Sequence, residues 1–467
     1  MPIRIVNSLT RKKEEFLPLN GKSVKMYVCG VTVYDVCHVG HARSLYIFDV
    51  IRQYFKYRGY DIFFVRNITD IDDKIINRAH ELNKSFEEVV ALNIQSYVND
   101  LESLGISRAD REPRATENIA EMITHIKGLI DKGLAYEAGG DVYFNVRKFT
   151  SYGKLSGQSM DKMYEAVRIE PDEKKKDPLD FALWKSSKPS EPSWDSPWGA
   201  GRPGWHIECS VMSMKHLGSP TLDIHAGGRD LIFPHHENEI AQSEGLTARP
   251  FARYWIHHGL LTINGQKMAK SLGNFITIQD ALKKYSVDQL KMFFLSSHYA
   301  SPIDFSESKM DETHKALDRF QIFFQKVDRL VKNKQSAKGA RPFIQDYKTH
   351  FEEAMDDDFN TPKALGVLFE FLNEMNKFID QESASADYEA TLTAASQMLK
   401  NLTGDIFGLF KDNGLKINVN DIENLLKERE EARLRRDFNR SDQIRDELKN
   451  RGILLEDTKE GQIWRRA

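Results

Sequence analysis

The chain has 467 residues, which is long enough for about three domains of ordinary size. Hydrophobic residues make up 40% of the sequence and charged residues 29%, a composition typical of a folded globular protein and not of a disordered one. The formal net charge of −3 argues against a protein coated in basic surface, although a local basic face can still bind RNA.

The first residues, Met1-Pro2-Ile3-Arg4, contain no apolar signal core, and no uninterrupted apolar stretch is long enough to cross a bilayer. We therefore expect a cytoplasmic protein without a membrane partner. The three cysteines, Cys29, Cys37 and Cys209, are an odd number at spacings that build no disulfide framework. Their roles are then metal binding or packing, and we expect packing for Cys37.

The first part of the chain alternates between strand and helix patterns. Residues 25–34 are β-branched, aromatic and apolar, which predicts a strand, and the periodic segment after them predicts a helix closed by Gly59. Residues 61–69 predict a second buried strand, and a long helical region is predicted from about 72 to 104. This β-α-β order predicts a parallel sheet.

The sheet pattern is then interrupted and resumes. Residues 105–204 combine a helical segment, one strand and a run rich in Pro, Ser, Lys and Trp, which we interpret as an insertion. A strand returns at 221–225, and a helix is expected to open near His235. A further strand over 255–266 ends in the tight-turn pair Asn264-Gly265.

The remainder of the chain has a helical pattern. Thr361 is predicted as an N-cap and Pro362 as the first helical residue after it. A charged amphipathic helix and a short tail follow Gly408. The predicted fold class is therefore α/β, a Rossmann-like parallel sheet split by an insertion and followed by a helical bundle and a small C-terminal domain. The predicted parts are 1–104, first half of the sheet domain; 105–204, connective insertion; 205–265, second half of the sheet domain; 266–310, a region that begins with a lysine-containing loop; 311–407, helical bundle; and 408–467, C-terminal domain.

Two short motifs point to nucleotide chemistry. His38-Val39-Gly40-His41 lies where a strand ends and a helix begins, so backbone N–H groups and the helix dipole face any anion placed there. Lys267-Met268-Ala269-Lys270-Ser271 brings two ammonium groups onto a loop, where they can stabilise charge that builds on a pyrophosphate. Alone, the first motif is also compatible with surface histidines and the second with a solvated loop. Their pairing on one split sheet is rare by chance.

A second group of residues points to a metal ion. His235 and Glu239 are four positions apart, so both project from one face if their segment is helical. Cys209 lies upstream, and Cys29 lies in the first strand beside the histidine motif. Nitrogen, sulfur and oxygen donors of this kind hold metals. The alternatives remain that both cysteines are small buried apolar residues, and that His236 replaces His235 as the donor.

The paired motifs resemble the HIGH and KMSKS signatures of class I aminoacyl-tRNA synthetases, which activate an amino acid with ATP and transfer it to tRNA. The segments YVCG, GWHIECS and FPHHENE resemble cysteinyl-tRNA synthetases in particular, and the likeness runs from Leu9 to the final arginines. Val39 and Ala269 replace Ile and Ser of the signatures, which leaves both histidines and both lysines in place.

The resemblance implies a cysteine–tRNA ligase that is a monomer and uses cysteine, tRNA(Cys) and ATP with Mg²⁺. It implies that His38 and His41 contact the phosphates, that Gly40 lets adenine lie against the backbone, and that Lys270, with Lys267, is the mobile cation. It also implies one Zn²⁺ per chain, with the ligands Cys29, Cys209, His235 and Glu239. The implied cysteine pocket consists of Thr69, Trp205, His225 and Asp230, each of which has an ordinary structural alternative.

Zinc offers a physical route to selectivity. Cysteine and serine differ by one atom, which a pocket that measures size resolves by only about 1–3 kcal/mol. A thiol at zinc loses its proton and forms a metal–sulfur bond, whereas a serine hydroxyl stays protonated. Our hypothesis is that the substrate thiolate joins the four protein ligands, so that no editing domain is needed.

The RNA-facing residues are expected near the end of the chain. Arginines interspersed with acidic residues precede an aromatic residue, a combination suited to phosphate contacts and base stacking: Arg433, Arg435, Arg436, Arg440, Arg445 and Trp464. An exposed helix with ion pairs is the alternative, but this segment also resembles the tail of cysteinyl-tRNA synthetases, which favours anticodon recognition. The run Lys174–Lys176 is interpreted as solvated charge rather than an acceptor-stem contact.

Three other functions remain compatible with these patterns. One is a cysteine ligase of the mycothiol pathway, whose acceptor is a sugar amine and whose relatives lack the C-terminal unit. Another is a zinc hydrolase built on His235, His236 and Glu237, for which the nucleotide motifs would be coincidence. The third is a catalytically silent RNA-binding relative, although both phosphate motifs and all four metal donors are present.

Overall fold

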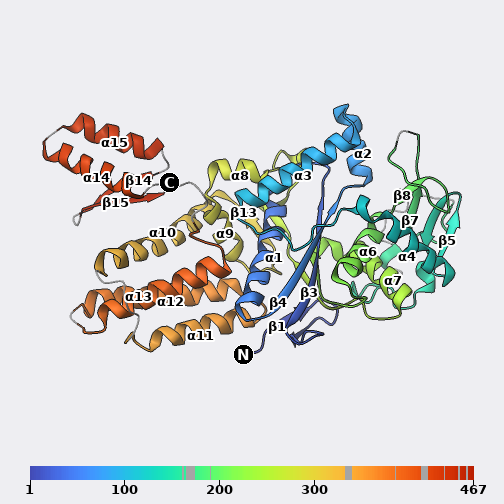
Figure 1. Ribbon diagram of the computed structural model, residues 1–467, viewed down its shortest axis with the longest axis horizontal. Helices are drawn as coiled ribbons and strands as arrows, with labels where there is room; N and C mark the ends of the chain where they lie inside the picture. The colour runs from blue at the N-terminus through green and yellow to red at the C-terminus, as the bar shows by residue number, and fades with distance from the viewer. Residues whose placement is uncertain are drawn as a thin grey trace.

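The computed structural model describes residues 1–159, 162–164, 174–189, 191–331, 339–383, 385–411, 419–435, 437–450, 453–458 and 461–466. Among these residues, none of the helices combines the length and the apolar character that a membrane span requires. Helices surround a central sheet, and a helical bundle extends from it toward a small C-terminal unit (Figure 1).

The centre of the molecule is a four-stranded parallel sheet with the order β10-β9-β3-β4. The strands β3 (Ser23–Thr32) and β4 (Asp61–Thr69) precede the insertion, whereas β9 (Leu222–Gly228) and β10 (Ala252–His258) follow it. Their side chains are largely buried, as expected for a parallel sheet covered on both faces. The predicted α/β class with a split parallel sheet is confirmed.

The two halves of the sheet meet between β3 and β9, where Tyr27 lies beside His225. The strand that follows β3 in the sheet, β4, lies on one side of this pair, and the strand that follows β9, β10, lies on the other. The position between β3 and β9 is therefore a topological switch point. Ligands of open α/β sheets bind in the crevice at the carboxyl ends of the strands at such a point. Two helices flank the crevice on opposite faces of the sheet: α1 (Val39–Tyr57) and α6 (Trp205–Leu217).

The long helix predicted over about 72–104 is two helices. The first, α2 (Asp73–Leu82), ends at Asn83, whose φ of 49° is left-handed. The second, α3 (Phe86–Ser103), begins with a capping box of Ser85 and Glu88. Asparagine tolerates the left-handed conformation, and serine three residues before glutamate is a helix start, so the break was readable in the sequence.

The insertion forms a layer of its own, and only one of its strands was predicted. Its sheet is antiparallel, in the order β5-β6-β7-β8. The elements are η1 (Ala115–Asn118), α4 (Ile119–Asp131), β5 (Ala135–Ala138), β6 (Asp141–Phe144), η2 (Val146–Lys148), β7 (Phe181–Ser186) and β8 (Gly201–Pro203).

The strand predicted over 255–266 is interrupted at Gly259, where a Cβ atom would lie 2.2 Å from the carbonyl oxygen of Ser301. A separate small sheet begins beyond this close approach. The Asn264-Gly265 turn is confirmed, since both residues have positive φ angles of 48° and 75°. The small sheet contains β11 (Leu261–Ile263), β12 (Gln266–Lys267) and β13 (Ile303–Phe305), and a hairpin at the start of the chain contains β1 (Arg4–Asn7) and β2 (Lys12–Glu15).

The helical region that follows is confirmed as helical, with one shift at a helix start. The side chain of Asn360, not Thr361, caps α12 by accepting a hydrogen bond from the Lys363 amide at 3.1 Å. The helices are α8 (Ile278–Lys284), α9 (Val287–Leu295), α10 (Glu307–Leu330), α11 (Phe343–Asp356), α12 (Thr361–Gln381), α13 (Tyr388–Asn401) and the short η6 (Leu402–Ile406).

The C-terminal unit contains two helices where one amphipathic helix was predicted. Its buried residues Ile444 and Leu448 form a cluster separate from the two large cores. Arg436, at the break between the helices, lies outside the described residues. The elements are α14 (Val419–Leu434), α15 (Phe438–Asn450), β14 (Ile453–Thr458) and β15 (Gly461–Arg466).

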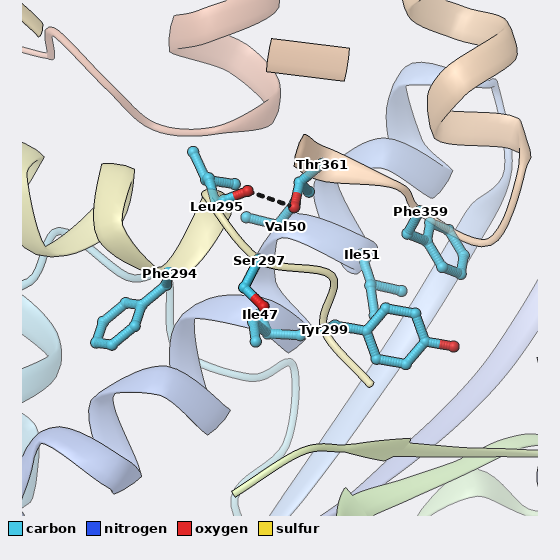
Figure 2. A pocket seen from close by; sticks show the side chains of 9 residues that line it. All are labelled: Ile47, Val50, Ile51, Phe294, Leu295, Ser297, Tyr299, Phe359 and Thr361. Carbon is cyan, nitrogen blue, oxygen red and sulfur yellow. Dashed lines mark hydrogen bonds between the residues drawn. The ribbon is translucent and has the colours of Figure 1, made fainter. Parts of the chain in front are cut away.

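The bundle docks on α1 through a tight apolar seam (Figure 2). The cavity left there measures about 10 Å³, roughly the space of one water molecule, so it is too small for a substrate. The Thr361 hydroxyl, from the first turn of α12, donates a hydrogen bond to the carbonyl of Leu295 at the end of α9 at 2.9 Å. This bond ties the bundle to α9, which lies in the chain between β12 and β13 of the small sheet.

We expect Thr361→Val to lower the free energy of unfolding by about 1–3 kcal/mol, because the buried Leu295 carbonyl loses its hydrogen-bond donor while the side-chain shape is kept. The measurement is the urea midpoint of the full-length chain. Thr361→Ser keeps the hydroxyl and is the matched control. Equal midpoints for the valine variant and the wild type would contradict this role of the hydroxyl.

Candidate metal and nucleotide site

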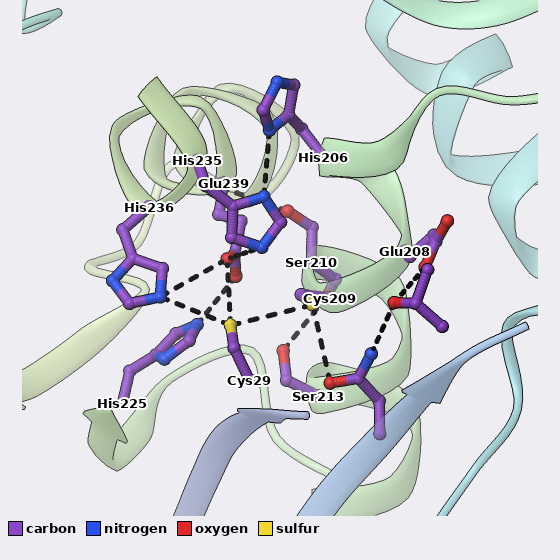
Figure 3. A network of polar contacts seen from close by, with 12 residues as sticks. Cys29, His206, Glu208, Cys209, Ser210, Ser213, His225, His235, His236 and Glu239 are labelled. Carbon is purple, nitrogen blue, oxygen red and sulfur yellow. Dashed lines mark hydrogen bonds and ion pairs between the residues drawn. The ribbon is translucent and has the colours of Figure 1, made fainter. Parts of the chain in front are cut away.

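Four donors from four elements converge at the switch point (Figure 3). Cys29 lies on β3, Cys209 on α6, His235 in the turn η4 (Ile232–His236) and Glu239 on α7 (Glu237–Thr247). One atom of each lies within 4.8 Å of the others. The Sγ atoms of Cys29 and Cys209 are 3.7 Å apart, well beyond a disulfide bond of about 2.05 Å. This set of sulfur, nitrogen and oxygen donors fits a tetrahedral metal ion such as zinc.

A second set also clusters, because His225 and His236 face the same Cys29 and Glu239. A histidine that binds a metal normally donates its other ring N–H to an acceptor. His235 Nδ1 has one, since it lies 2.9 Å from His206 Nδ1. The buried Nδ1 of His225 has no hydrogen-bond partner among the described residues. His225 Nε2 instead lies 2.6 Å from Glu239 Oε2, where it orients that carboxylate. The chemistry therefore favours the first set.

His236 has partners on both ring nitrogens. Its Nε2 lies 3.2 Å from the sulfur of Cys29, and its Nδ1 lies 2.8 Å from His257 Nε2. His257 in turn contacts the hydroxyl of Ser8 at 2.8 Å. His206 and His257 were not singled out from the sequence. The spacing does carry a signal for His206, because it precedes Cys209 by three positions on one helix and so shares its face.

Buried charges set the protonation of the metal-free donors. Burial and the contact with Cys209 raise the pKa of Cys29 well above its ordinary value. Burial opposes the thiolate of Cys209, but hydrogen bonds with Cys29 and His235 lower its pKa to about 6. Burial likewise opposes a charged His235, but Glu239 and the Cys209 sulfur raise its pKa to about 10. Despite its burial, Glu239 keeps a pKa well below the usual range because of His225 and His235.

Metal binding is expected to release two protons at about pH 9, one from the Cys29 thiol and one from the His235 imidazolium. At that pH, unperturbed thiols would already be largely ionised and an unperturbed imidazole would be neutral. Affinity therefore rises with pH and is lost as these two groups hold their protons. Calorimetric titration of chelator-buffered Zn²⁺ in buffers of different ionisation enthalpy counts the protons. A release below one proton would contradict the assignment.

The histidine motif opens α1. His38 is the N-cap, and its Nδ1 accepts hydrogen bonds from the amides of Gly40 at 3.1 Å and His41 at 3.4 Å. His41 Nδ1 accepts from the His38 amide at 3.2 Å. Burial lowers the pKa of His38 to about 4 and that of His41 to about 3, so both rings are neutral near pH 7. Because each Nδ1 is an acceptor, the proton of each ring is on Nε2, which can donate to an anion.

Glycine is required at position 40 by close packing. A Cβ atom there would lie 2.8 Å from His38 Cε1 and 3.5 Å from the methyl carbon of Met268. The second contact joins the two sequence motifs. Lys270, at the start of η5 (Lys270–Leu272), forms an ion pair with Asp35 in the loop before the histidine motif. The lysine loop therefore lies against the start of α1.

Both motifs border one cavity of about 480 Å³ that also reaches Cys29, one of the four metal donors. Its lining includes Cys29, His38, Gly40, His41, Lys267, Trp205 and Asp230. Trp205 stacks on the ring of His235 with a centroid distance of 4.2 Å. Thr69 and His225 do not line the cavity: the Thr69 hydroxyl donates to Glu208 at 2.8 Å, and His225 holds Glu239.

Glu237 has a different environment from the metal donors. Its buried carboxylate accepts hydrogen bonds from the amides of Leu155 at 3.2 Å and Ser156 at 2.8 Å, and so it anchors a turn of the insertion. A zinc hydrolase would need this carboxylate as a general base beside the metal-bound water. Glu237 is therefore not placed to act as the general base of a zinc hydrolase.

Some charged residues of the insertion and the C-terminal unit have partners within the protein. Lys174 pairs with Asp141 at 2.7 Å, and Lys176 lies over the ring of Tyr136. Arg440 pairs with Glu428 between α14 and α15 at 2.8 Å. Trp464 lies on β15, and its side chain is outside the described part of the chain.

Solved structures share this architecture. Mycobacterium tuberculosis methionyl-tRNA synthetase in complex with methionyl-adenylate aligns with a TM-score of 0.63 and 14% identity over 83% of this chain and 92% of that chain. A putative arginyl-tRNA synthetase from Campylobacter jejuni aligns with a TM-score of 0.56 and 14% identity over 85% of this chain and 95% of that one. The fold is that of class I aminoacyl-tRNA synthetases.

Sequence comparison narrows the class. Family models match residues 15–315, a class I (C) tRNA synthetase catalytic domain, residues 350–411, a DALR domain, and residues 419–465, a cysteinyl-tRNA ligase anticodon binding domain. Cysteine–tRNA ligases from Thermodesulfovibrio yellowstonii and Sulfurihydrogenibium sp. are each 50% identical, over 99% of both chains and 100% of both chains respectively. The chain belongs to the cysteinyl-tRNA synthetase family of aminoacyl-tRNA ligases.

Proposed function

We propose that this chain activates cysteine with ATP to cysteinyl-adenylate, releases pyrophosphate, and transfers cysteine to the 3′ end of tRNA(Cys). The observation that carries the proposal is a single cavity bordered by Cys29 at one side and by both nucleotide motifs at another, in a chain of this family. ATP with Mg²⁺ is the second substrate, one Zn²⁺ is bound per chain, and the enzyme acts as a monomer.

The nucleotide side of the cavity stabilises phosphate charge without covalent chemistry. The Nε2–H groups of His38 and His41 donate to phosphate oxygens, together with the positive end of α1. Lys270 exchanges its ion pair with Asp35 for the pyrophosphate, and Lys267 lies beside the same path. Charge that develops on the leaving group in the transition state is thereby neutralised. Gly40 keeps this wall open to the nucleotide, since any larger residue meets the ring of His38.

The amino-acid side of the cavity is proposed to recognise sulfur. Cys29, Cys209, His235 and Glu239 would hold a zinc ion, which when bound would supply a site for a thiolate. Trp205, stacked on His235, closes the wall next to these donors, and Asp230 accepts the substrate ammonium group. His225 and Thr69 act through other residues, because His225 fixes the Glu239 carboxylate and Thr69 bonds to Glu208. His206 fixes the ring of His235.

This arrangement discriminates by bond type and not by volume. A cavity that only excludes size would tell cysteine from serine by about 1–3 kcal/mol. A cysteine thiol can lose its proton and bind zinc as a thiolate. A serine hydroxyl keeps its proton near neutral pH and is a poor zinc ligand. Selection at this step removes the need for a separate editing site.

Cys209→Ser is expected to lower bound zinc and to reduce cysteine-dependent ATP–pyrophosphate exchange by about 100-fold or more, because a primary donor is lost. Cys37→Ser is the matched control, since Cys37 is buried outside the donor set. Metal content and exchange with cysteine and with serine are measured on the same preparations. A fully demetallated enzyme that still activates cysteine and rejects serine would refute zinc-based selection.

The competing acceptor is the sugar amine of a mycothiol-pathway ligase. The C-terminal match to an anticodon binding domain over residues 419–465 favours tRNA instead. This unit has its own small core and is joined to the bundle after Phe410, which packs on Phe320 and Phe324.

A chain ending at Lys411 is expected to keep cysteine-dependent ATP–pyrophosphate exchange within about twofold, because it retains the sheet, both motifs and the Phe410 contacts. Its kcat/KM for charging tRNA(Cys) should fall by at least about tenfold, the loss expected when a few phosphate and stacking contacts disappear. Charging kinetics on in vitro transcribed tRNA test this. Undiminished charging would overturn the assignment of the C-terminal unit.

A further inference from the structure

Arg43 is a buried cation whose hydrogen bonds to the described residues all go to backbone oxygens. It lies in the second turn of α1 and has no exposed surface. Its Nη1 donates to two carbonyls and its Nη2 to two others: Gly259 at 2.8 Å, Leu260 at 2.9 Å, Tyr299 at 3.3 Å and Ser301 at 2.6 Å. Its Nε is buried without a hydrogen-bond partner among the described residues.

Three other buried arginines each have a carboxylate partner. The pairs are Arg52 with Asp110, Arg66 with Glu112 and Arg202 with Asp73. Among the described residues, no acidic side chain forms an ion pair with Arg43. Burial lowers its pKa only to about 10, so it is charged near pH 7. Carbonyl groups satisfy hydrogen bonds but carry no net charge, so the positive charge of Arg43 stays uncompensated.

The charge of Arg43 faces the cavity that both nucleotide motifs border. Arg43 lies in the wall of the cavity of about 480 Å³, which it shares with His38, His41 and Lys267. The positive end of α1 is directed at the same space. The carbonyls that Arg43 binds precede β11 and β13, so the guanidinium also fixes the root of the hairpin that carries Lys267. Asp230 also lines this cavity, but among the described residues no carboxylate forms an ion pair with Arg43.

We propose that Arg43 is an electrostatic positioning residue for the nucleotide, and that the phosphates of the bound nucleotide supply the counter-charge that the protein does not. Its N–H groups are engaged by carbonyls, so it acts through space and not by a direct hydrogen bond. At an effective dielectric constant of about 20, a unit charge about 10 Å from a phosphate changes the affinity for that anion by about tenfold or more. The inference rests on the proposed function for the identity of the nucleotide.

The test compares ATP with adenosine, which fills the same base and ribose contacts without phosphate charge. We expect Arg43→Gln to raise the Kd for ATP by about tenfold while the Kd for adenosine changes less than about twofold. Arg43→Lys keeps the charge but cannot reach all four carbonyls. It should retain the wild-type ratio of the Kd for adenosine to the Kd for ATP, which Arg43→Gln should lower. Arg52→Gln is the control, because the charge it removes is already balanced by Asp110. Isothermal titration calorimetry gives both constants, and circular dichroism checks the fold.

Equal losses for ATP and adenosine, or the same loss of ratio in Arg43→Lys as in Arg43→Gln, would mean that Arg43 acts only by shaping the loops, and the inference would be wrong. If Arg43→Gln does not fold, the ratio in Arg43→Lys alone decides: a preserved ratio supports the charge, and a lowered one refutes it. A wild-type enzyme without cysteine-dependent exchange would instead refute the proposed function. Normal exchange with an unchanged ratio in Arg43→Gln refutes only the role of Arg43.

Discussion

The site depends on one buried carboxylate. Glu239 has no exposed surface, yet its two oxygens contact His225 at 2.6 Å, His235 at 3.0 Å and the sulfur of Cys29 at 3.5 Å. A buried charge is tolerable only with such partners. The partners come from β9, η4 and β3, so satisfying this single charge requires both halves of the sheet to be in register. The split sheet and the donor cluster are thus one constraint.

The sequence was most informative where a local pattern has one structural solution. The strand at Asp61–Thr69 was predicted with its observed bounds, because a run of apolar and β-branched residues indicates a buried strand. Asn264-Gly265 forms the expected turn, because these residue types favour positive φ angles. Errors arose where a tertiary contact ends an element. The strand predicted over 255–266 stops at Gly259 because the chain near Ser301 approaches closely, and no local pattern reveals a neighbour more than 40 residues away.

The same distinction applies to the site. Residue type and spacing suggested Cys29, Cys209, His235 and Glu239, and spacing placed His235 and Glu239 on one helical face, but only a three-dimensional arrangement brings the two cysteines to 3.7 Å. The supporting residues could not be ranked from sequence. His257 reaches His236 from β10, and Ser8 reaches His257 from the start of the chain, so these contacts exist only after the sheet has closed. Orientation of ligands by such partners is a long-range property.

The site therefore has two electrostatic halves. Around Glu239 and Cys209 the donors are anionic and suit a cation, whereas the start of α1 combines neutral histidines with an uncompensated Arg43 and suits an anion. Neutral imidazoles matter here, because charged ones so near Arg43 would add to the cost of an empty site. An aminoacyl-adenylate has a matching polarity, with the amino-acid side chain at one end and the anionic phosphate between the aminoacyl group and the adenosine. The fold brings these two halves together because the sheet pairs β3 with β9, although the insertion separates these strands in the sequence. The histidine motif follows β3, and His235 and Glu239 follow β9.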